Sequence, residues 1–210
     1  MICIPLKHKS STQLLKKIKE AQGLADLLEI HFDQLKIISD KTLKQIFKST
    51  NLPILYKSLG QKDKLEKVLK YRPAYLDLDL KTSHSLINLV RKISPKTKLI
   101  LSHHDFEKTP SSKILKALVG KMRKKGADIC KIATSAKNLA DSFRILELLS
   151  EESPKSPCIF IAMGRKGRIS RLTGHLFGNY LMYAPLDKKS STANGQIPAK
   201  ELKQILCHLK

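Results

Sequence analysis

The sequence of 210 residues lacks any long apolar run. A helix that crosses a bilayer needs about 20 consecutive apolar residues, and the apolar start at residues 1–6 is too short for the core of a signal peptide. We therefore expect a protein without membrane segments that is located in the cytoplasm. The chain also has no internal repeat and no low-complexity linker, so we expect residues 1–210 to form one domain.

Cysteine is scarce, and its spacing excludes a common kind of site. The four cysteines are scattered within predicted strands and a helix, without the CxxC spacing typical of zinc sites. We expect them to be reduced packing residues, as is usual in cytoplasmic proteins. No metal or other cofactor is expected. The cysteines are Cys3, Cys130, Cys158 and Cys207.

Acidic residues are few, since 18 Asp and Glu stand against 40 Lys and Arg and give a net charge of +22. Such a balance invites a nucleic-acid interpretation. Most of the lysines, however, fall on the polar faces of amphipathic helices, and there is no tryptophan and no recognisable nucleic-acid motif. We expect no specific nucleic-acid binding, but a positive field that helps to attract a small anionic substrate. A non-catalytic barrel that binds polyanions stays open as an alternative.

Short apolar runs typical of strands alternate with amphipathic helical segments along the whole chain. Eight such units in a row predict an α/β fold, a single parallel (β/α)8 TIM barrel. The main alternative is a doubly wound open sheet, which a glycine-rich phosphate-binding turn after the first strand would support, and none is present. The predicted strands are residues 2–6, 27–33, 53–58, 74–80, 98–104, 127–135, 157–164 and 180–185.

The sixth predicted strand contains a lysine, Lys131, in the middle of an apolar, β-branched run. A buried ammonium without a partner costs several kcal/mol or more. One interpretation is an edge strand with Lys131 pointing into water. The other is a lysine in the barrel lumen, where lost hydration and nearby cations lower its pKa from about 10.4 until the free amine can attack a carbonyl.

Side-chain alternation places further polar residues on the lumen faces of two strands. Glu29, His31 and Asp33 share one face of the second strand, and Asp77 and Asp79 share one face of the fourth. Both faces of a barrel strand are normally buried, so these residues must line a site or pair with one another. A structural pairing of Glu29 and Asp79 with the lysine of the sixth strand is the alternative to a site.

Basic residues occur at the ends of other predicted strands. Lys57 ends the third strand, and one of the adjacent His103 and His104 on the fifth strand must face the lumen. The C-terminal ends of the strands are where barrel enzymes place their chemistry. An amine nucleophile such as Lys131 beside an acid or base meets the requirement for Schiff-base chemistry on a ketone or aldehyde.

Four motifs resemble those of the type I 3-dehydroquinate dehydratase family, in the same order and on the corresponding strands. The sequence His-Asp-Phe-Glu-Lys-Thr-Pro at 104–110 resembles the family's His-Asp-Phe-x-x-Thr-Pro motif, and Asp-Ile-Cys-Lys-Ile-Ala at 128–133 resembles its lysine strand. Met-Gly-Arg-Lys-Gly-Arg-Ile-Ser-Arg at 163–171 and Gly-Gln-Ile at 195–197 resemble its remaining two motifs. The resemblance covers nearly the whole chain.

The resemblance implies a lyase that converts 3-dehydroquinate to 3-dehydroshikimate in the shikimate pathway of aromatic amino acid biosynthesis. Lys131 would form an imine with the substrate ketone, and His104 would serve as general base and general acid. Arg171 would bind the substrate carboxylate, because its planar fork suits that anion. The remaining substrate-binding residues would be Glu29, His31, Lys57, Thr192 and Gln196. The resemblance also allows a homodimer.

The chain departs from the family's pattern at several of these positions. His31 and Lys57 stand where the family has arginine, and Gln61 falls near a glutamate that supports the histidine. Thr192 and Asn194 replace a usual serine and proline. Neither histidine nor lysine reproduces the arginine fork, so we expect slower turnover or weaker binding rather than a different reaction. These departures are the only support for a second enzyme alternative, a class I aldolase-like Schiff-base lyase.

Overall fold

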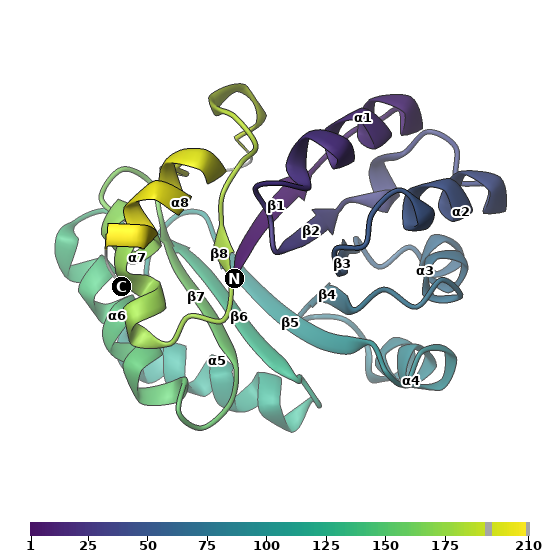
Figure 1. Cartoon of the computed structure of the whole chain (residues 1–210). Helices are drawn as coiled ribbons and strands as arrows, with labels where there is room; N and C mark the ends of the chain where they lie inside the picture. The colour runs from purple at the N-terminus through teal and green to yellow at the C-terminus, as the bar shows by residue number, and fades with distance from the viewer. Residues whose placement is uncertain (192–194, 209–210) are drawn as a thin grey trace.

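Eight parallel strands curve into a nearly closed barrel with the connecting helices on its outside (Figure 1). The computed structural model describes residues 1–191 and 195–208. The strands are hydrogen-bonded in the order β7-β6-β5-β4-β3-β2-β1-β8, which confirms the predicted TIM barrel. The strands are β1 (Ile2–Leu6), β2 (Leu27–Ile30), β3 (Ile54–Lys57), β4 (Tyr75–Asp79), β5 (Lys98–Asp105), β6 (Ile129–Ser135), β7 (Cys158–Met163) and β8 (Met182–Tyr183).

Three of the α-helices begin at polar caps that the sequence supplies. The side chains of Ser39, Ser83 and Asn138 each accept a hydrogen bond from a backbone N–H in the first turn of the following helix. No helix within the described residues is long and apolar enough to cross a membrane. The α-helices are α1 (Ser11–Ala21), α2 (Asp40–Lys48), α3 (Lys62–Leu69), α4 (His84–Ile93), α5 (Ser112–Lys124), α6 (Leu139–Glu152), α7 (Arg168–Thr173) and α8 (Ala199–His208).

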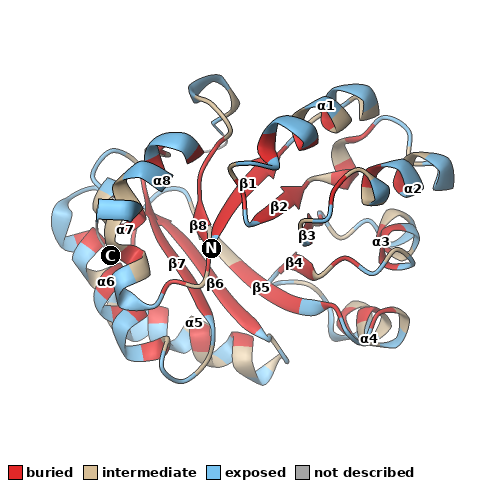
Figure 2. Ribbon diagram, viewed as in Figure 1, coloured by how far each residue is buried: buried red, intermediate tan, exposed pale blue. Residues whose placement is uncertain are grey.

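Burial divides the apolar residues into two layers, and Figure 2 shows the strands buried and the outer helix surfaces exposed. Between strands and helices lies a large core that includes Leu28, Tyr56 and Leu101. Alternate strand residues form a smaller cluster inside the barrel, among them Ile100 and Ile159. Fully burying one such side chain stabilises the fold by roughly 1.5–3 kcal/mol. The inner cluster fills the lower lumen, so only the C-terminal ends of the strands leave room for a site.

The barrel closes between β7 and the segment that precedes β8. One parallel bridge joins Cys158 to Asn179, and the Tyr180 N–H donates to the Cys158 carbonyl at 2.8 Å. The Asn179 side chain extends the seam, because its Oδ1 accepts a hydrogen bond of 3.0 Å from the Phe160 N–H. The Asn179 side chain thus supplies one of the hydrogen bonds that a backbone carbonyl would make if β8 were paired with β7 along its length.

The second strand ends earlier than the sequence pattern predicts. β2 stops at Ile30, and the next residues form a short 3₁₀ helix, η1 (Phe32–Gln34). The turn takes Asp33 away from the lumen, where its carboxylate accepts hydrogen bonds from the Tyr56 hydroxyl and from Ser58 Oγ. The prediction that Asp33 shares the lumen face of β2 is therefore wrong. Two further 3₁₀ helices are η2 (Gly174–Phe177) and η3 (Lys188–Ser190).

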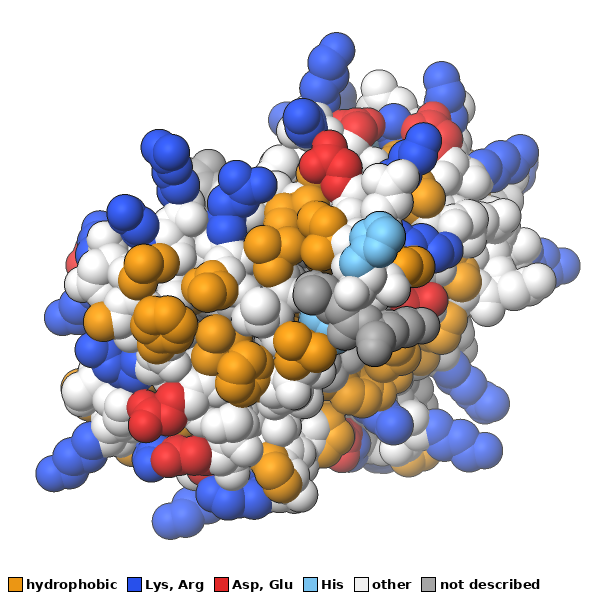
Figure 3. Space-filling view, turned by 60° about the vertical axis from the view of Figure 1, so that its left-hand side comes forward, with side chains coloured by type: hydrophobic (Ala, Val, Ile, Leu, Met, Phe, Trp, Pro, Cys, Tyr) orange, Lys and Arg blue, Asp and Glu red, His pale blue; other side chains and the backbone are white. Residues whose placement is uncertain are grey.

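Basic side chains dominate the surface. In Figure 3 the blue lysine and arginine side chains project around the edges of the face shown, and the red acidic ones are fewer. Surface ion pairs neutralise some of them, for example Lys116 with Glu151 at 2.7 Å. The excess of 40 basic over 18 acidic residues leaves most of the surface positive.

Candidate active site

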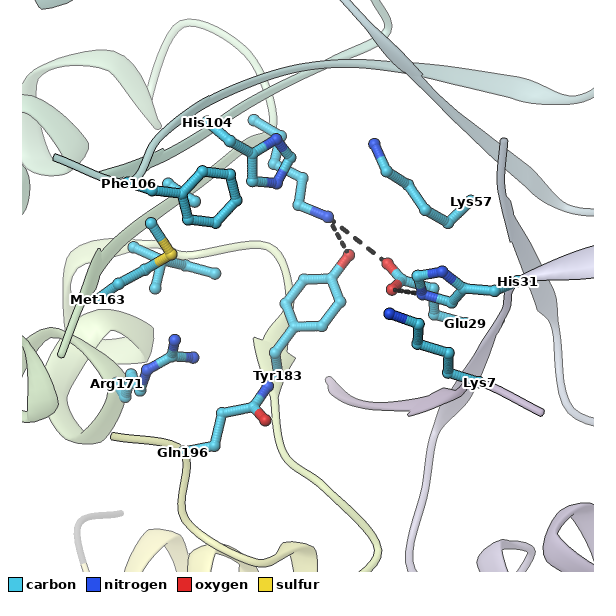
Figure 4. Close-up of a pocket in the computed structure, with 13 residues that line it drawn as sticks. Lys7, Glu29, His31, Lys57, His104, Phe106, Met163, Arg171, Tyr183 and Gln196 are labelled. Atoms are coloured by element: carbon cyan, nitrogen blue, oxygen red, sulfur yellow. Dashed lines mark hydrogen bonds and ion pairs between the residues drawn. The ribbon is translucent and has the colours of Figure 1, made fainter. Parts of the chain in front are cut away.

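A cavity of about 220 Å³ lies at the C-terminal end of the barrel, where alternate residues of six strands converge (Figure 4). Its floor is the inner apolar cluster, and its walls carry polar side chains together with apolar ones such as Phe106 and Met163. The structure brings seven of the eight predicted site residues to this cavity, and the eighth, Thr192, lies outside the described residues. The seven are Glu29, His31, Lys57, His104, Lys131, Arg171 and Gln196.

Lys131 lies inside the barrel and not at an edge. β6 pairs with β5 on one side and β7 on the other, and Lys131 is only 5 % exposed. Its Nζ donates to Asp77 Oδ2 at 2.7 Å and to the Tyr183 hydroxyl at 2.9 Å, and it lies 3.5 Å from Glu29 Oε2. The alternative of a solvent-facing edge lysine is therefore wrong.

Asp77 holds two ammonium groups from opposite sides. Besides Lys131, it accepts hydrogen bonds on Oδ1 from Lys57 Nζ at 2.7 Å and from Ser102 Oγ at 2.6 Å. The carboxylate is fully buried, so both contacts are strong charge-assisted hydrogen bonds. Asp79, which the sequence offered as a partner for Lys131, is exposed at the end of β4. The structural counter-ion of Lys131 is Asp77.

The charge state of Lys131 differs from the sequence expectation. Burial opposes the ammonium form, but the carboxylates of Asp77 and Glu29 outweigh burial and raise the pKa of Lys131 above its usual value. The expectation of a lowered pKa assumed only lost hydration and nearby cations, and it is wrong because it left out the two carboxylates. Lys131 therefore rests as an ammonium and must lose a proton before it can act as a nucleophile.

His104 is in the opposite state. Burial and the positive charges of Lys131 and Lys57 lower the pKa of His104 to about 4, so the imidazole is neutral at pH 7. Its ring is stacked on the ring of Phe106 with the centroids 6.0 Å apart. Gln61, the expected supporting residue, is exposed and precedes α3 as its N-cap. A neutral imidazole at the rim of the cavity can accept a proton.

Glu29 and His31 form a pair across the end of β2. His31 Nε2 lies 2.9 Å from Glu29 Oε1 (Figure 4). Burial favours the protonated acid, but Lys131 and the hydrogen bond with His31 prevail and lower the pKa of Glu29 to about 2. The second oxygen, Oε2, is buried and has no hydrogen-bond partner among the described residues. Glu29 is thus an ionised carboxylate whose Oε2 lies 3.5 Å from the Lys131 ammonium and accepts no hydrogen bond from the described residues.

Arg171 brings an unpaired cation to the opposite wall. Its side chain, on α7, is 7 % exposed, and its Nε has no hydrogen-bond partner within the described part of the chain. Burial without a carboxylate lowers the pKa of Arg171 to about 10, so the guanidinium is still charged at pH 7. A buried cation without a counter-ion is costly, and a bound carboxylate would supply one in bidentate geometry.

Gln196 reaches the cavity from the segment after β8. The preceding Gly195 has a φ of +81°, and a Cβ at this position would lie 2.4 Å from the Gly164 carbonyl oxygen. Only glycine permits this close approach of two loops. Ser191 Oγ donates to Gln196 Oε1 at 3.1 Å. The Gly-Gln sequence therefore fixes the amide at the mouth of the cavity.

Sequence reasoning missed three residues that contribute to the site. Asp77 was recognised as a lumen residue but not as the partner of Lys131, and Tyr183 was not singled out although its position on β8 shares the lumen parity of Leu181. Lys7, just after β1, also lines the cavity. Within residues 1–191 and 195–208, no group of three His, Cys, Asp or Glu is arranged to hold a metal ion.

Comparison with known sequences points to one family. The family model for type I 3-dehydroquinase matches residues 2–210. A 3-dehydroquinate dehydratase of Methanococcus maripaludis is 34% identical over 221 residues, which span 98% of each chain. A chloroplastic bifunctional 3-dehydroquinate dehydratase/shikimate dehydrogenase of Arabidopsis thaliana is 33% identical, over 96% of this chain and 36% of the longer protein.

Solved structures agree with these sequence matches. The 3-dehydroquinate dehydratase of Geobacillus kaustophilus superposes with a TM-score of 0.89 at 26% identity, over 99% of this chain and 90% of the other. The type I enzyme of Clostridium difficile, solved with covalently modified comenic acid, gives a TM-score of 0.85 at 27% identity, over 99% and 91% of the two chains.

Proposed function

The chain belongs to the type I 3-dehydroquinase family, and we propose that it dehydrates 3-dehydroquinate to 3-dehydroshikimate, a step of the shikimate pathway, through a Schiff base on Lys131. The observation that carries the proposal is the meeting of three groups in one cavity of about 220 Å³. These are a buried lysine, a neutral histidine and an arginine without a counter-ion among the residues that the structure describes. Each group meets one chemical requirement of the reaction.

Lys131 is the proposed nucleophile. As a neutral amine, its nitrogen attacks the substrate ketone, and loss of water from the adduct gives an imine. The protonated imine withdraws electrons from the neighbouring carbon, whose C–H becomes acidic. The carboxylates that hold Lys131 as an ammonium at rest, Asp77 and Glu29, equally stabilise the positive iminium at the same place.

His104 is the proposed general base and acid. It is neutral because its pKa is lowered to about 4, so it can take the proton from the activated carbon. It then holds a proton that it can give to the departing hydroxyl, which leaves as water. The products are an unsaturated imine and, after its hydrolysis, the enone and the free amine of Lys131.

Arg171 is the proposed partner of the substrate carboxylate. A guanidinium that is buried and unpaired at rest gains the counter-ion that it lacks when this anion binds. Glu29 can accept a hydrogen bond from a substrate hydroxyl, and Gln196 can contact the substrate from the segment after β8. Thr192, for which the structure gives no position, is proposed for the same segment on the resemblance alone.

We propose that His31 and Lys57 contact the substrate less strongly than the arginines that the family has at these positions. The Lys57 ammonium already donates to Asp77 and to Ser102, at 2.7 and 3.0 Å, which leaves it one donor for substrate. His31 is engaged by Glu29 and offers no planar fork. We predict that His31→Arg lowers the KM for 3-dehydroquinate, as steady-state kinetics would reveal, and an unchanged or higher KM would contradict this assignment.

The proposed reaction is tested by the appearance of enone absorbance when 3-dehydroquinate is added. The wild-type protein should generate the signal, and Lys131→Ala should not. Lys125→Ala is a matched control, because it removes a lysine that donates to the Leu80 carbonyl, and neither Lys125 nor Leu80 lines the cavity. A wild-type protein without activity on this substrate but active on other ketones or aldehydes would favour the aldolase-like alternative.

A further inference from the structure

Lys7 is a cation of the cavity to which the proposed mechanism assigns no part. It directly follows β1 and lines the cavity together with Glu29 and His31 (Figure 4). Its ammonium forms no hydrogen bond and no ion pair with the residues that the structure describes. Because an ammonium has three N–H donors and no acceptor, Lys7 can offer all three donors to a bound molecule.

The pairing of β1 with β2 places Lys7 beside His31. The register pairs Pro5 with Glu29, and beyond this pair the His31 N–H donates to the Leu6 carbonyl at 3.2 Å. Lys7 and His31 each lie two positions beyond the paired residues, so alternation turns both side chains to the lumen, where both line the cavity. The ammonium of Lys7 therefore belongs to the same wall as the Glu29 carboxylate.

The other basic side chains on this wall are already engaged. His31 Nε2 lies 2.9 Å from Glu29 Oε1, and Lys57 Nζ donates to Asp77 at 2.7 Å. Either side chain would have to give up its contact in order to turn fully to a bound molecule. Lys7 has no such contact to lose within the described part of the chain.

We propose that Lys7 is a further substrate-binding residue, which donates a hydrogen bond to the ring hydroxyl whose hydrogen Glu29 accepts, and that it makes the site specific for substrates with this hydroxyl. The inference rests on the proposed function, because it concerns how 3-dehydroquinate is held. A hydroxyl both donates and accepts, whereas a carboxylate only accepts and an ammonium only donates. A hydroxyl between Glu29 and Lys7 therefore has both roles filled by charged partners, which make the stronger hydrogen bonds.

The Glu29 carboxylate is prepared for this contact. Its Oε2 is buried and accepts no hydrogen bond from the described residues, so an incoming hydroxyl meets an acceptor that lacks a donor. Lys7, by contrast, is exposed, and water solvates its ammonium until the substrate covers it. Only the difference between the contact with the hydroxyl and the contact with water contributes to binding, so the effect of Lys7 should be moderate.

The substrate carboxylate is the other group that Lys7 could meet. It is assigned to Arg171 on the opposite wall, whose guanidinium is buried without a carboxylate beside it. An anion stabilises a buried unpaired cation more than an exposed, hydrated one. With the carboxylate at Arg171, the side of the ring that carries hydroxyls is left to face Lys7.

The test compares Lys7→Met with the wild type by steady-state kinetics on 3-dehydroquinate. The contact is present in the bound substrate and in the transition state alike, so we expect KM to rise about tenfold with kcat unchanged. Lys7→Arg keeps the charge and the N–H donors and should restore most of the affinity. Lys9→Met is the matched control, because Lys9 is an exposed lysine two residues further on that does not line the cavity, and its KM should stay close to that of the wild type.

High salt separates a direct contact from a general effect of positive charge. At 1 M salt the field of exposed charges extends only about 3 Å, so an effect of the field alone would disappear. The higher KM of Lys7→Met should largely persist under these conditions. A rise in KM that vanishes at 1 M salt, or that Lys9→Met reproduces, would overturn the proposed contact.

Two analogues of 3-dehydroquinate, each without one of the ring hydroxyls that the reaction does not expel, identify the contacted group. Lys7→Met should lower kcat/KM about tenfold for the parent substrate and for one analogue, and hardly at all for the analogue that lacks the contacted hydroxyl. Equal losses with both analogues would contradict the assignment. A wild-type protein that does not dehydrate 3-dehydroquinate would contradict the proposed function and this inference with it, whereas an active wild type whose KM does not depend on Lys7 would contradict only the inference.

Discussion

At the scale of single residues, the site is a set of opposed charge states. Lys131 is held as an ammonium by Asp77 and Glu29, while the same positive charge, together with burial, keeps His104 neutral. The two protonation states are linked, because loss of the positive charge on Lys131 would allow the pKa of His104 to rise. The cavity therefore contains both the lysine proposed to form the imine, Lys131, and a neutral imidazole that can accept a proton, His104.

The lowered pKa of His104 leads to a prediction about acid pH. A base must be neutral, and a pKa of about 4 means that His104 is protonated only as the pH falls through that value. We expect kcat/KM of the wild type to hold its value well below pH 6.5, the ordinary range of histidine, and to fall near pH 4. His104→Asn should lower kcat by about 10²-fold or more. An acid limb near pH 6.5 would contradict the assignment.

Arg171 should show opposite effects on binding and on stability. Arg171→Met removes the hydrogen bonds to a charged substrate group, worth about 1.5–3 kcal/mol, so KM should rise roughly tenfold to a hundredfold. The same change removes a buried unpaired cation, so the free energy of unfolding should be unchanged or higher. Steady-state kinetics and urea denaturation measure the two. Reduced stability with an unchanged KM would indicate a purely structural arginine.

At the scale of elements, the sequence predicts repeated units better than the ends of strands. The eight strand–helix units and the lumen position of Lys131 follow from periodicity and parity. The end of β2 does not, because Asp33 accepts hydrogen bonds from Tyr56 on β3 and from Ser58 just after β3, and this draws the chain into η1. The alternation of polar and apolar residues along β2 cannot reveal that Asp33 bonds to residues from another part of the chain.

The same limit explains the errors about the site. The pairing of Lys131 with Asp77 joins two strands that are not adjacent in the sheet, and only the closed barrel sets their distance of 2.7 Å. The sign of the Lys131 pKa shift depends on that distance, since burial alone would have lowered the value. Tyr183 shares the lumen parity of Leu181 in the strand predicted at 180–185, but its role depends on the 2.9 Å contact of its hydroxyl with Lys131 on another strand, which parity does not reveal.

The seam of the barrel gives a prediction at this scale. Asn179 Oδ1 accepts the Phe160 N–H at 3.0 Å, where a longer β8 would have supplied a backbone carbonyl. Asn179→Ala leaves this buried donor unsatisfied and should lower the free energy of unfolding by about 1–3 kcal/mol. Asn51→Ala, at an exposed position, is the control and should have little effect. Urea denaturation compares them, and equal stability would mean that the seam does not depend on Asn179.

At the scale of the whole molecule, the net charge of +22 surrounds a cavity that is itself rich in cations. Lys7, Lys57 and Arg171 line the mouth, so the field should draw an anionic substrate inward. Added salt screens this field over about 8–10 Å at moderate ionic strength. We expect kcat/KM for 3-dehydroquinate to fall with ionic strength while kcat stays constant. Salt-independent kcat/KM would show that the surface charge has no role in capture.

The most direct measurement for the whole account is mass spectrometry of the protein after borohydride treatment in the presence of 3-dehydroquinate. The account predicts a covalent adduct on Lys131 alone, present in the wild type and absent in Lys131→Ala. The surface lysines serve as internal controls, because they lie outside the cavity and should stay unmodified, as should Lys7 and Lys57, which line the cavity beside Lys131. An unmodified Lys131, or equal labelling of surface lysines, would contradict the Schiff-base assignment on which the account depends.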